Sequence, residues 1–149
     1  MTDHPIRLFA SDEAVRHVTR GLLDRSLPRP EWTHEAHLAA CTCLLLEYPD
    51  FVPLRDLPGT IAGYNVAVGG VNDETQGYHE TITRFYVLAV AAHLEADIAG
   101  SLVGRVNRLL ASERGRRDYP LRFWSRDRLF SRAARRGWVE PDLRPLAEC

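Results

Sequence analysis

Hydrophobic residues recur at intervals of three and four along most of the chain, which is the spacing of an amphipathic α-helix. Val15, Val18 and Leu22 mark one such segment near the beginning, and Leu102 and Val106 mark another further on. No stretch of useful length alternates between apolar and polar residues, as a half-buried strand does. The pattern therefore predicts an all-α protein.

Cap residues and helix-breaking residues set the expected boundaries of these helices. They predict helices over about residues 11–26, 33–48, 57–68, 73–96 and 101–114, and two short helical pieces that start near Ser125 and Ser131. We expect residues 1–149 to form a single helical domain, a bundle of four to five helices with short C-terminal helical segments.

Composition narrows the class of protein without naming a function. With 45% hydrophobic and 26% charged residues, the chain has the make-up of an ordinary globular protein. Three cysteines are too few for a disulfide framework, and charged residues interrupt the first twenty positions, which leaves no apolar segment for a signal peptide. We therefore expect a soluble, cytoplasmic protein that has no membrane partner.

Charge is distributed unevenly along the chain. Residues 1–99 hold 7 arginines against 14 acidic residues, whereas residues 100–149 hold 12 arginines against 6 acidic residues. The acidic residues interleaved with the C-terminal arginines, and the near-zero total charge, argue against nucleic-acid binding. We expect a small-molecule substrate or ligand instead, and the sequence leaves a homodimer open.

Two histidines stand three positions apart at the start of the predicted helix 33–48. They are His34 and His37, in the W-T-H-E-A-H-L segment. Residues i and i+3 of a helix lie on the same face, with Cβ atoms about 5–6 Å apart, so both rings could bind one ion. Apolar residues continue this face, and we therefore expect the two rings to point toward the core.

A third histidine, His79, stands in the G-Y-H-E-T segment near the start of another predicted helix. Asp73 and Gln76 have the form of a capping box, which predicts that this helix begins at Asp73 and that His79 lies on its inward face. Three protein ligands with an open position form a minimal catalytic metal site. We therefore predict that the rings of His34, His37 and His79 converge on a divalent metal.

Zinc is the default metal, because neutral imidazole and an open tetrahedral geometry suit it; iron, nickel, copper and manganese stay open. Glu35 directly follows His34, and Glu80 directly follows His79. Either glutamate could be a further ligand, a group that orients an imidazole, or a general base. If Glu80 replaced His79 as a ligand, the set would become the two-histidine, one-carboxylate arrangement of non-haem iron.

A simpler interpretation of the same residues competes with the metal site. The H-x-x-H spacing is a weaker signal than H-E-x-x-H, and histidines near helix starts also cap helices and form ordinary hydrogen bonds. Cys41, on the same face as His34 and His37, could act as a nucleophile, although a small buried thiol is more often a packing residue.

Four segments of the chain resemble those of a family of small bacterial proteins that are uncharacterised. The W-T-H-x-A-H-L and G-Y-H-E-T motifs carry the resemblance, together with S-R-x-R-L-x-S from Ser125 and G-W-V-E-P-D-L from Gly137. The resemblance covers most of the chain from Trp32 onward. It implies no established activity.

The sequence thus supports two functions of different classes. The first is a metal-dependent enzyme of the hydrolase or lyase type, in which Glu80 or Glu35 handles protons for a small polar metabolite. The alternative is a helical module that binds a metal or a small ligand without turnover.

Overall fold

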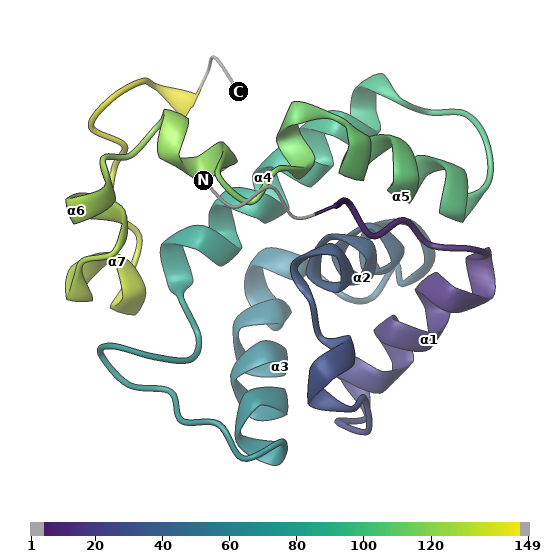
Figure 1. Cartoon of the computed structure of the whole chain (residues 1–149), viewed down its shortest axis with the longest axis horizontal. Coiled ribbons are helices and arrows are strands. Elements are labelled where there is room, and N and C mark those ends of the chain that lie inside the picture. Colours follow the sequence, from purple (N-terminus) through teal and green to yellow (C-terminus); the bar gives the residue numbers. More distant parts are fainter. Residues whose placement is uncertain (1–4, 147–149) are drawn as a thin grey trace.

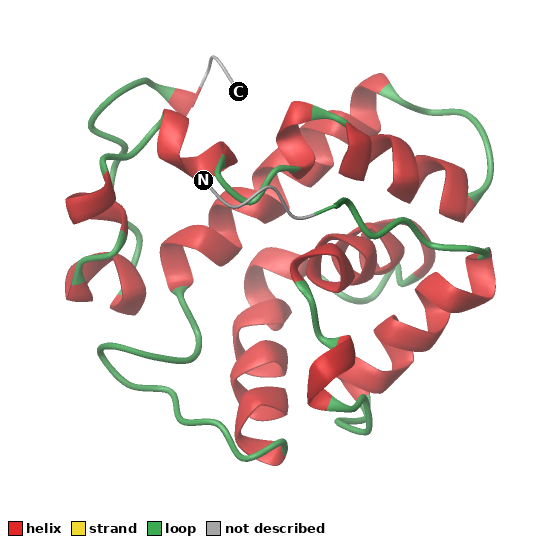
Figure 2. Cartoon of the chain, viewed as in Figure 1, coloured by secondary structure: helices red, strands yellow, loops and turns green. Residues whose placement is uncertain are grey.

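The computed structural model describes residues 5–146, and within this range every regular element is a helix (Figures 1 and 2). The α-helices are α1 (Asp12–Leu23), α2 (His34–Glu47), α3 (Pro53–Ala67), α4 (Glu80–Ala96), α5 (Leu102–Ala111), α6 (Arg126–Leu129) and α7 (Arg132–Arg136). Three short 3₁₀ helices, at Arg29–Glu31, Glu113–Gly115 and Tyr119–Arg122, complete the set. The predicted all-α fold with short C-terminal helical segments is confirmed. No helix in residues 5–146 is both long and apolar enough to cross a membrane.

Side-chain caps fix most of the helix starts where the sequence predicted them. A hydroxyl oxygen accepts a hydrogen bond from a backbone N–H in the first turn of five helices, which stabilises a helix end by about 1 kcal/mol. The five capping residues are Ser11, Thr33, Ser101, Ser125 and Ser131.

The cap of helix α4 lies six residues later than the capping-box pattern predicted, at His79 in place of Asp73. Asp73 accepts hydrogen bonds from the backbone of Thr75 and Gln76, but these bonds close a local turn and not a helix. Gly77 then takes a φ of +83°, and a Cβ there would lie 2.2 Å from the carbonyl oxygen of Val71, so the chain needs glycine at this turn. The helix starts only after it, with His79 as its cap.

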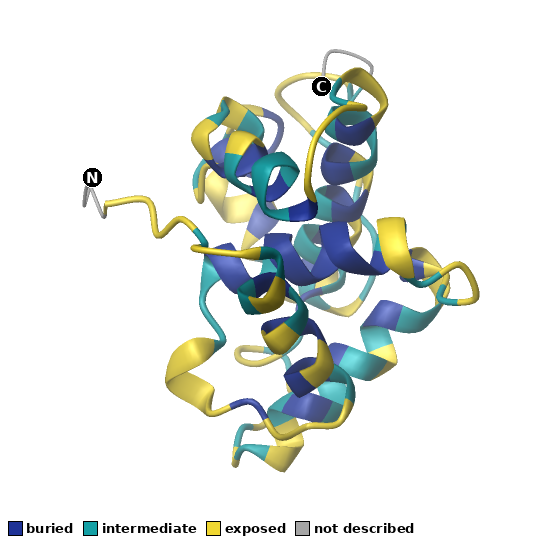
Figure 3. Cartoon of the chain, turned by 90° about the vertical axis from the view of Figure 1, so that its right-hand side faces the viewer, coloured by how far each residue is buried: buried dark blue, intermediate teal, exposed yellow. Residues whose placement is uncertain are grey.

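Helix α2 lies at the centre of the fold and contacts α1, α3, α4 and α5 (Figure 1). Every residue from Leu38 to Leu44 is buried, so α2 is enclosed on all sides and is not the amphipathic helix that the sequence suggested. Figure 3 shows the buried positions on the sides of the surrounding helices that face the interior.

A second apolar cluster joins the C-terminal segment to α4. Phe85 is fully buried and packs edge-on against Trp124, with 5.1 Å between the ring centroids. Tyr119 and Phe123 extend this aromatic cluster, and Leu129 of α6 closes it. The cluster places α6 and α7 beside the start of α4 (Figure 1).

Candidate functional site

The start of α2 is built around Thr33 and Trp32. Thr33 is the cap: its hydroxyl accepts a hydrogen bond from the backbone N–H of Ala36 at 3.1 Å. The indole of Trp32 stacks on the ring of His37, with 3.8 Å between the centroids. The ring of His34 meets Tyr86 of α4 edge-on at 5.5 Å. Both histidines therefore follow the cap and belong to the start of α2. Each imidazole ring contacts one aromatic side chain.

Each of these histidines makes one hydrogen bond to a backbone carbonyl. Nε2 of His34 lies 2.8 Å from the oxygen of Gly115, and Nδ1 of His37 lies 2.7 Å from the oxygen of Thr33. A carbonyl oxygen only accepts, so the ring nitrogen that faces it carries the proton. Nδ1 of His34 and Nε2 of His37 are then left with lone pairs, and neither forms a hydrogen bond within residues 5–146.

Both rings are neutral at physiological pH. Burial lowers the pKa of His37 to about 4 and also lowers the pKa of His34, in each case against the smaller opposing effect of the carbonyl. Gly115 lies in a 3₁₀ turn after α5, and a Cβ there would lie 2.3 Å from the oxygen of Leu109, so this turn needs glycine. The 3₁₀ turn that contains Gly115 thus fixes the tautomer of His34.

A cavity of about 300 Å³ opens beside these two rings, between α2, α3 and α4. We call it the histidine cavity; its lining includes His34, His37, Trp32, Tyr86, Thr83 and Cys41. Its other walls are aliphatic, with Leu22, Leu38, Ala40, Leu57, Ile61, Ile82 and Val87. No lining residue carries a formal charge when the histidines are neutral. Such an apolar cavity with a few polar groups is typical of a small-molecule site.

Four other polar groups line the cavity: the hydroxyls of Thr83 and Tyr86, the thiol of Cys41 and the indole N–H of Trp32. Tyr86 donates its hydroxyl to the carbonyl of Arg116 at 2.7 Å. Burial raises the pKa of Cys41 to about 12, so its thiol stays protonated and is not an activated nucleophile. Besides the donors of Trp32 and Thr83, the cavity therefore offers a ligand the lone-pair nitrogens of His34 and His37.

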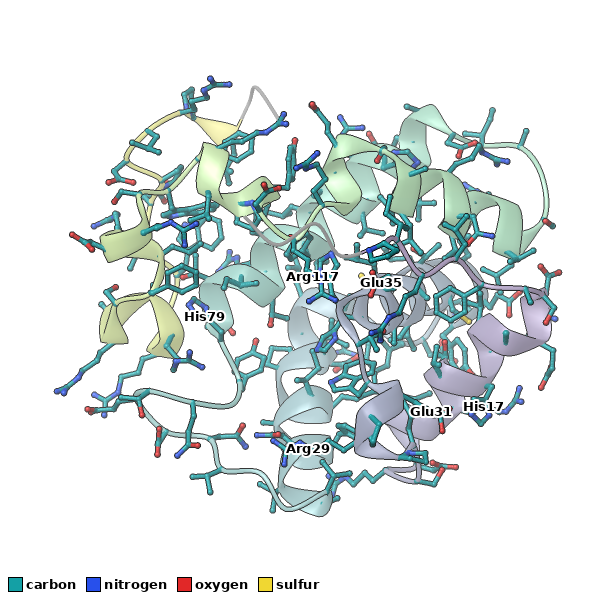
Figure 4. The ribbon with its side chains drawn as sticks, viewed as in Figure 1. His17, Arg29, Glu31, Glu35, His79 and Arg117 are labelled. Carbon is teal, nitrogen blue, oxygen red and sulfur yellow. The ribbon has the colours of Figure 1, made fainter. Side chains whose placement is uncertain are left out.

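His79 occupies a different environment at the start of α4 (Figure 4). Its Nδ1 accepts the backbone N–H of Ile82 at 3.2 Å, which makes His79 the helix cap, and its Nε2 lies 2.8 Å from the carbonyl of Leu129 in α6. Both ring nitrogens are thus occupied by backbone groups. His79 does not line the histidine cavity, and its side chain is directed toward α6 and α7.

The predicted convergence of His34, His37 and His79 is therefore not found. Residues 5–146 contain no group of three or more histidine, cysteine or acidic side chains arranged to hold a metal ion. The physical reason is the cap: His79 has an extended backbone, φ −131° and ψ 110°, so helical periodicity does not set its direction. The structure brings His34 and His37 together, and α4 contributes Ile82, Thr83, Tyr86 and Val87 to the cavity instead.

The G-Y-H-E-T segment serves as a docking point for the C-terminal segment. Besides the bond from His79 to Leu129, Thr81 donates its hydroxyl to the carbonyl of Gly137 at 2.8 Å. Arg135 of α7 donates to the carbonyl of Gly77 at 2.8 Å. This role explains the polar residues of the motif without a bound ligand.

The two glutamates also have separate surroundings. Glu80 accepts the hydroxyl of Tyr78 at 2.6 Å. Glu35 is 5% exposed and faces Arg117, whose guanidinium lies 3.6 Å from Oε1, a distance too long for a hydrogen bond (Figure 4). Neither glutamate lines the histidine cavity, so their predicted catalytic roles stay predictions.

Three residues of the cavity were not singled out as site residues from the sequence: Trp32, Thr83 and Tyr86. Trp32 adjoins the first motif, and its position was a usable signal. Thr83 and Tyr86 lie on one face of α4, which the sequence spacing shows. Their position beside His37 depends on the packing of α2 against α4, which the spacing does not show. Comparison of the chain with protein-family models, with curated proteins and with solved structures found no match.

Proposed function

We propose that this protein binds a small, largely apolar molecule in the histidine cavity, without covalent change to it. The observation that supports the proposal is the cavity itself, whose volume of about 300 Å³ falls at the lower end of ligand pockets. Its lining residues are half-buried or buried, and none is charged at neutral pH. Such a site gains most from the burial of apolar surface.

The proposal is tested with toluene, a probe that fits an apolar cavity and makes no hydrogen bonds. Toluene should shift the methyl NMR signals of Leu38, Ile61 and Val87, which line the cavity from three helices. The matched variant is Ala40→Leu, because Ala40 lines the cavity and is 1% exposed, so a larger side chain fills the space.

In Ala40→Leu the toluene shifts should disappear, while a thermal melt shows that the variant still folds at a cost of about 1 kcal/mol. Equal shifts in both proteins, or shifts confined to residues outside the cavity, would reject the proposal.

A metal-dependent enzyme of the hydrolase or lyase type is the second candidate, and one observation favours it. Metal-binding histidines usually donate their other ring N–H to a carbonyl or carboxylate, as His34 and His37 do here. With His79 engaged, the metal would take two protein ligands from α2 and the rest from substrate or water. Glu35 or Glu80 would then act on protons only after a change of side-chain position.

Elemental analysis of protein purified without a histidine tag tests this second candidate. The control is His93→Ala, because His93 lies in the last turn of α4 and does not line the cavity. A zinc content near one equivalent, lost in His37→Ala and kept in His93→Ala, would support this candidate. Metal content near zero that added ions do not restore would end it. The cytoplasmic location expected from the sequence belongs to both proposals.

A further inference from the structure

The chemistry of the histidine cavity restricts the ligand further than its size does. Nδ1 of His34 and Nε2 of His37 present lone pairs and no proton, because the opposite nitrogen of each ring is committed to a carbonyl. Both nitrogens accept hydrogen bonds and donate none. Both rings line the histidine cavity, and neither histidine is fully buried.

Charge on the ligand is disfavoured from two sides. A carboxylate or phosphate would find no cationic side chain in the lining of the cavity, and a cation would find no acidic one. Moving an unpaired charge into apolar surroundings costs far more than moving a neutral polar group. A neutral molecule avoids this cost.

The walls of the cavity suit a planar ring. Trp32 stacks on His37, Tyr86 stands edge-on to His34, and both aromatic side chains line the cavity beside the imidazoles. Aliphatic side chains from α2, α3 and α4, among them Leu38, Ile61 and Val87, form the rest. Aromatic rings gain from such mixed surroundings beyond the burial of their area.

We propose that the ligand is a neutral aromatic molecule with one O–H or N–H donor, of the phenol or indole class. The donor is accepted by Nε2 of His37, and the ring occupies the aliphatic part of the cavity. This inference rests on the ligand-binding function proposed above. It adds the identity of the polar group and the residue that recognises it.

Three probes of similar shape separate the hydrogen bond from the burial of the ring: phenol, anisole and toluene. Phenol has the donor, anisole has the same oxygen with a methyl group in place of the proton, and toluene has neither. Titrations in the presence of a metal chelator should show phenol binding about tenfold more tightly than the other two, the effect of one well-made hydrogen bond.

The variant His37→Phe keeps a planar ring and removes the acceptor. The advantage of phenol over toluene should fall to about one, while toluene still binds. In the control His79→Asn the advantage should be unchanged, because His79 lies outside the cavity. If His37→Phe does not fold, the imidazole nitrogen signals of His37 in the wild type decide the question, since phenol should shift them and toluene should not.

The outcomes distinguish this inference from the function on which it rests. Equal affinities for the three probes, or tighter binding of benzoate or benzylammonium than of phenol, would overturn the donor class and leave the cavity as a ligand site. Phenol binding that requires a metal would also overturn it. Failure of all three probes to bind would remove the proposed function as well.

Discussion

At the start of α2 the helix cap is Thr33, whereas at the start of α4 the cap is His79 itself. His34 and His37 therefore follow their cap, and each keeps one nitrogen free beside the histidine cavity. In His79, Nδ1 accepts a hydrogen bond from its own helix and Nε2 donates one to α6. Two similar motifs thus do different work, and the position of histidine relative to the cap makes the difference.

The comparison predicts that loss of the His79 ring harms stability more than binding. His79→Ala removes the cap of α4 and leaves the carbonyl of Leu129 without its donor. We expect a loss of about 2–3 kcal/mol, the sum of a cap and an unsatisfied buried carbonyl. Chemical denaturation measures it.

His79→Asn is the matched control, because asparagine caps helices well but cannot reach Leu129. It should recover about 1 kcal/mol of the loss. If His79→Ala proved as stable as the wild type, the ring would have no structural task, and the contrast between the two helix starts would be lost.

Acidification should destabilise the protein through the neutral histidines. In the unfolded chain His37 binds a proton near its usual pKa of 6.5, but in the folded chain only near 4, so the unfolded state holds more protons between these values. The contribution of neutral His37 to the free energy of unfolding is complete above about pH 6.5 and is lost as the pH falls toward 4. Burial lowers the pKa of His34 and His79 as well, and both act in the same direction.

Thermal melts between pH 7.5 and 4 should therefore show a falling midpoint, and the fall should be smaller in His37→Phe. The aspartates whose pKa is lowered act mostly below this range, since their usual value is 3.8. A pH profile of His37→Phe that parallels the wild type would show that His37 is not held neutral by burial.

The glutamate beside His34 gives a smaller test. Arg117→Gln should cost about 1 kcal/mol or more, because the buried Glu35 carboxylate loses its nearest cation. Arg122→Gln, which breaks the exposed pair with Glu113, should cost less than about 0.5 kcal/mol. The double variant Glu35→Gln, Arg117→Gln should recover most of the stability; equal losses for Arg117→Gln and Arg122→Gln would mean that the burial of Glu35 has no energetic weight.

The glutamate beside His79 should matter least. Glu80→Gln keeps an acceptor for the hydroxyl of Tyr78, so the change in unfolding free energy should stay within a few tenths of a kcal/mol, roughly the scale of exposed substitutions. A loss comparable to that of Arg117→Gln would show that the charge of Glu80 has a task that these contacts do not reveal.

Most helices of the fold could be predicted from residues close to one another in the sequence. Ser11 and Thr33 cap helices at the starts that the sequence predicted, because a capping hydroxyl acts on the next three residues alone. The start of α4 was predicted wrongly because Asp73 and Gln76 satisfy the capping pattern within a turn. Only Gly77, with its positive φ, marks the break.

The candidate site was predicted in part. His34 and His37 were correctly placed on one inward face, since both lie within a helix and follow its period. The direction of His79 depended on Leu129, fifty residues away, and the tautomer of His34 depended on Gly115. Such long-range backbone partners leave no mark in the spacing of residues along the chain.

The central claim is that His37 offers a lone-pair nitrogen to the cavity while His79 offers none. Proton–nitrogen correlation spectra of the imidazoles at pH 7, with and without phenol, test it most directly. We expect His37 to be neutral with its proton on Nδ1, and its Nε2 signal to shift when phenol is added. We expect His79 to carry its proton on Nε2 and to show no shift. A proton on Nε2 of His37, or a joint shift of His34, His37 and His79 on addition of zinc, would contradict it.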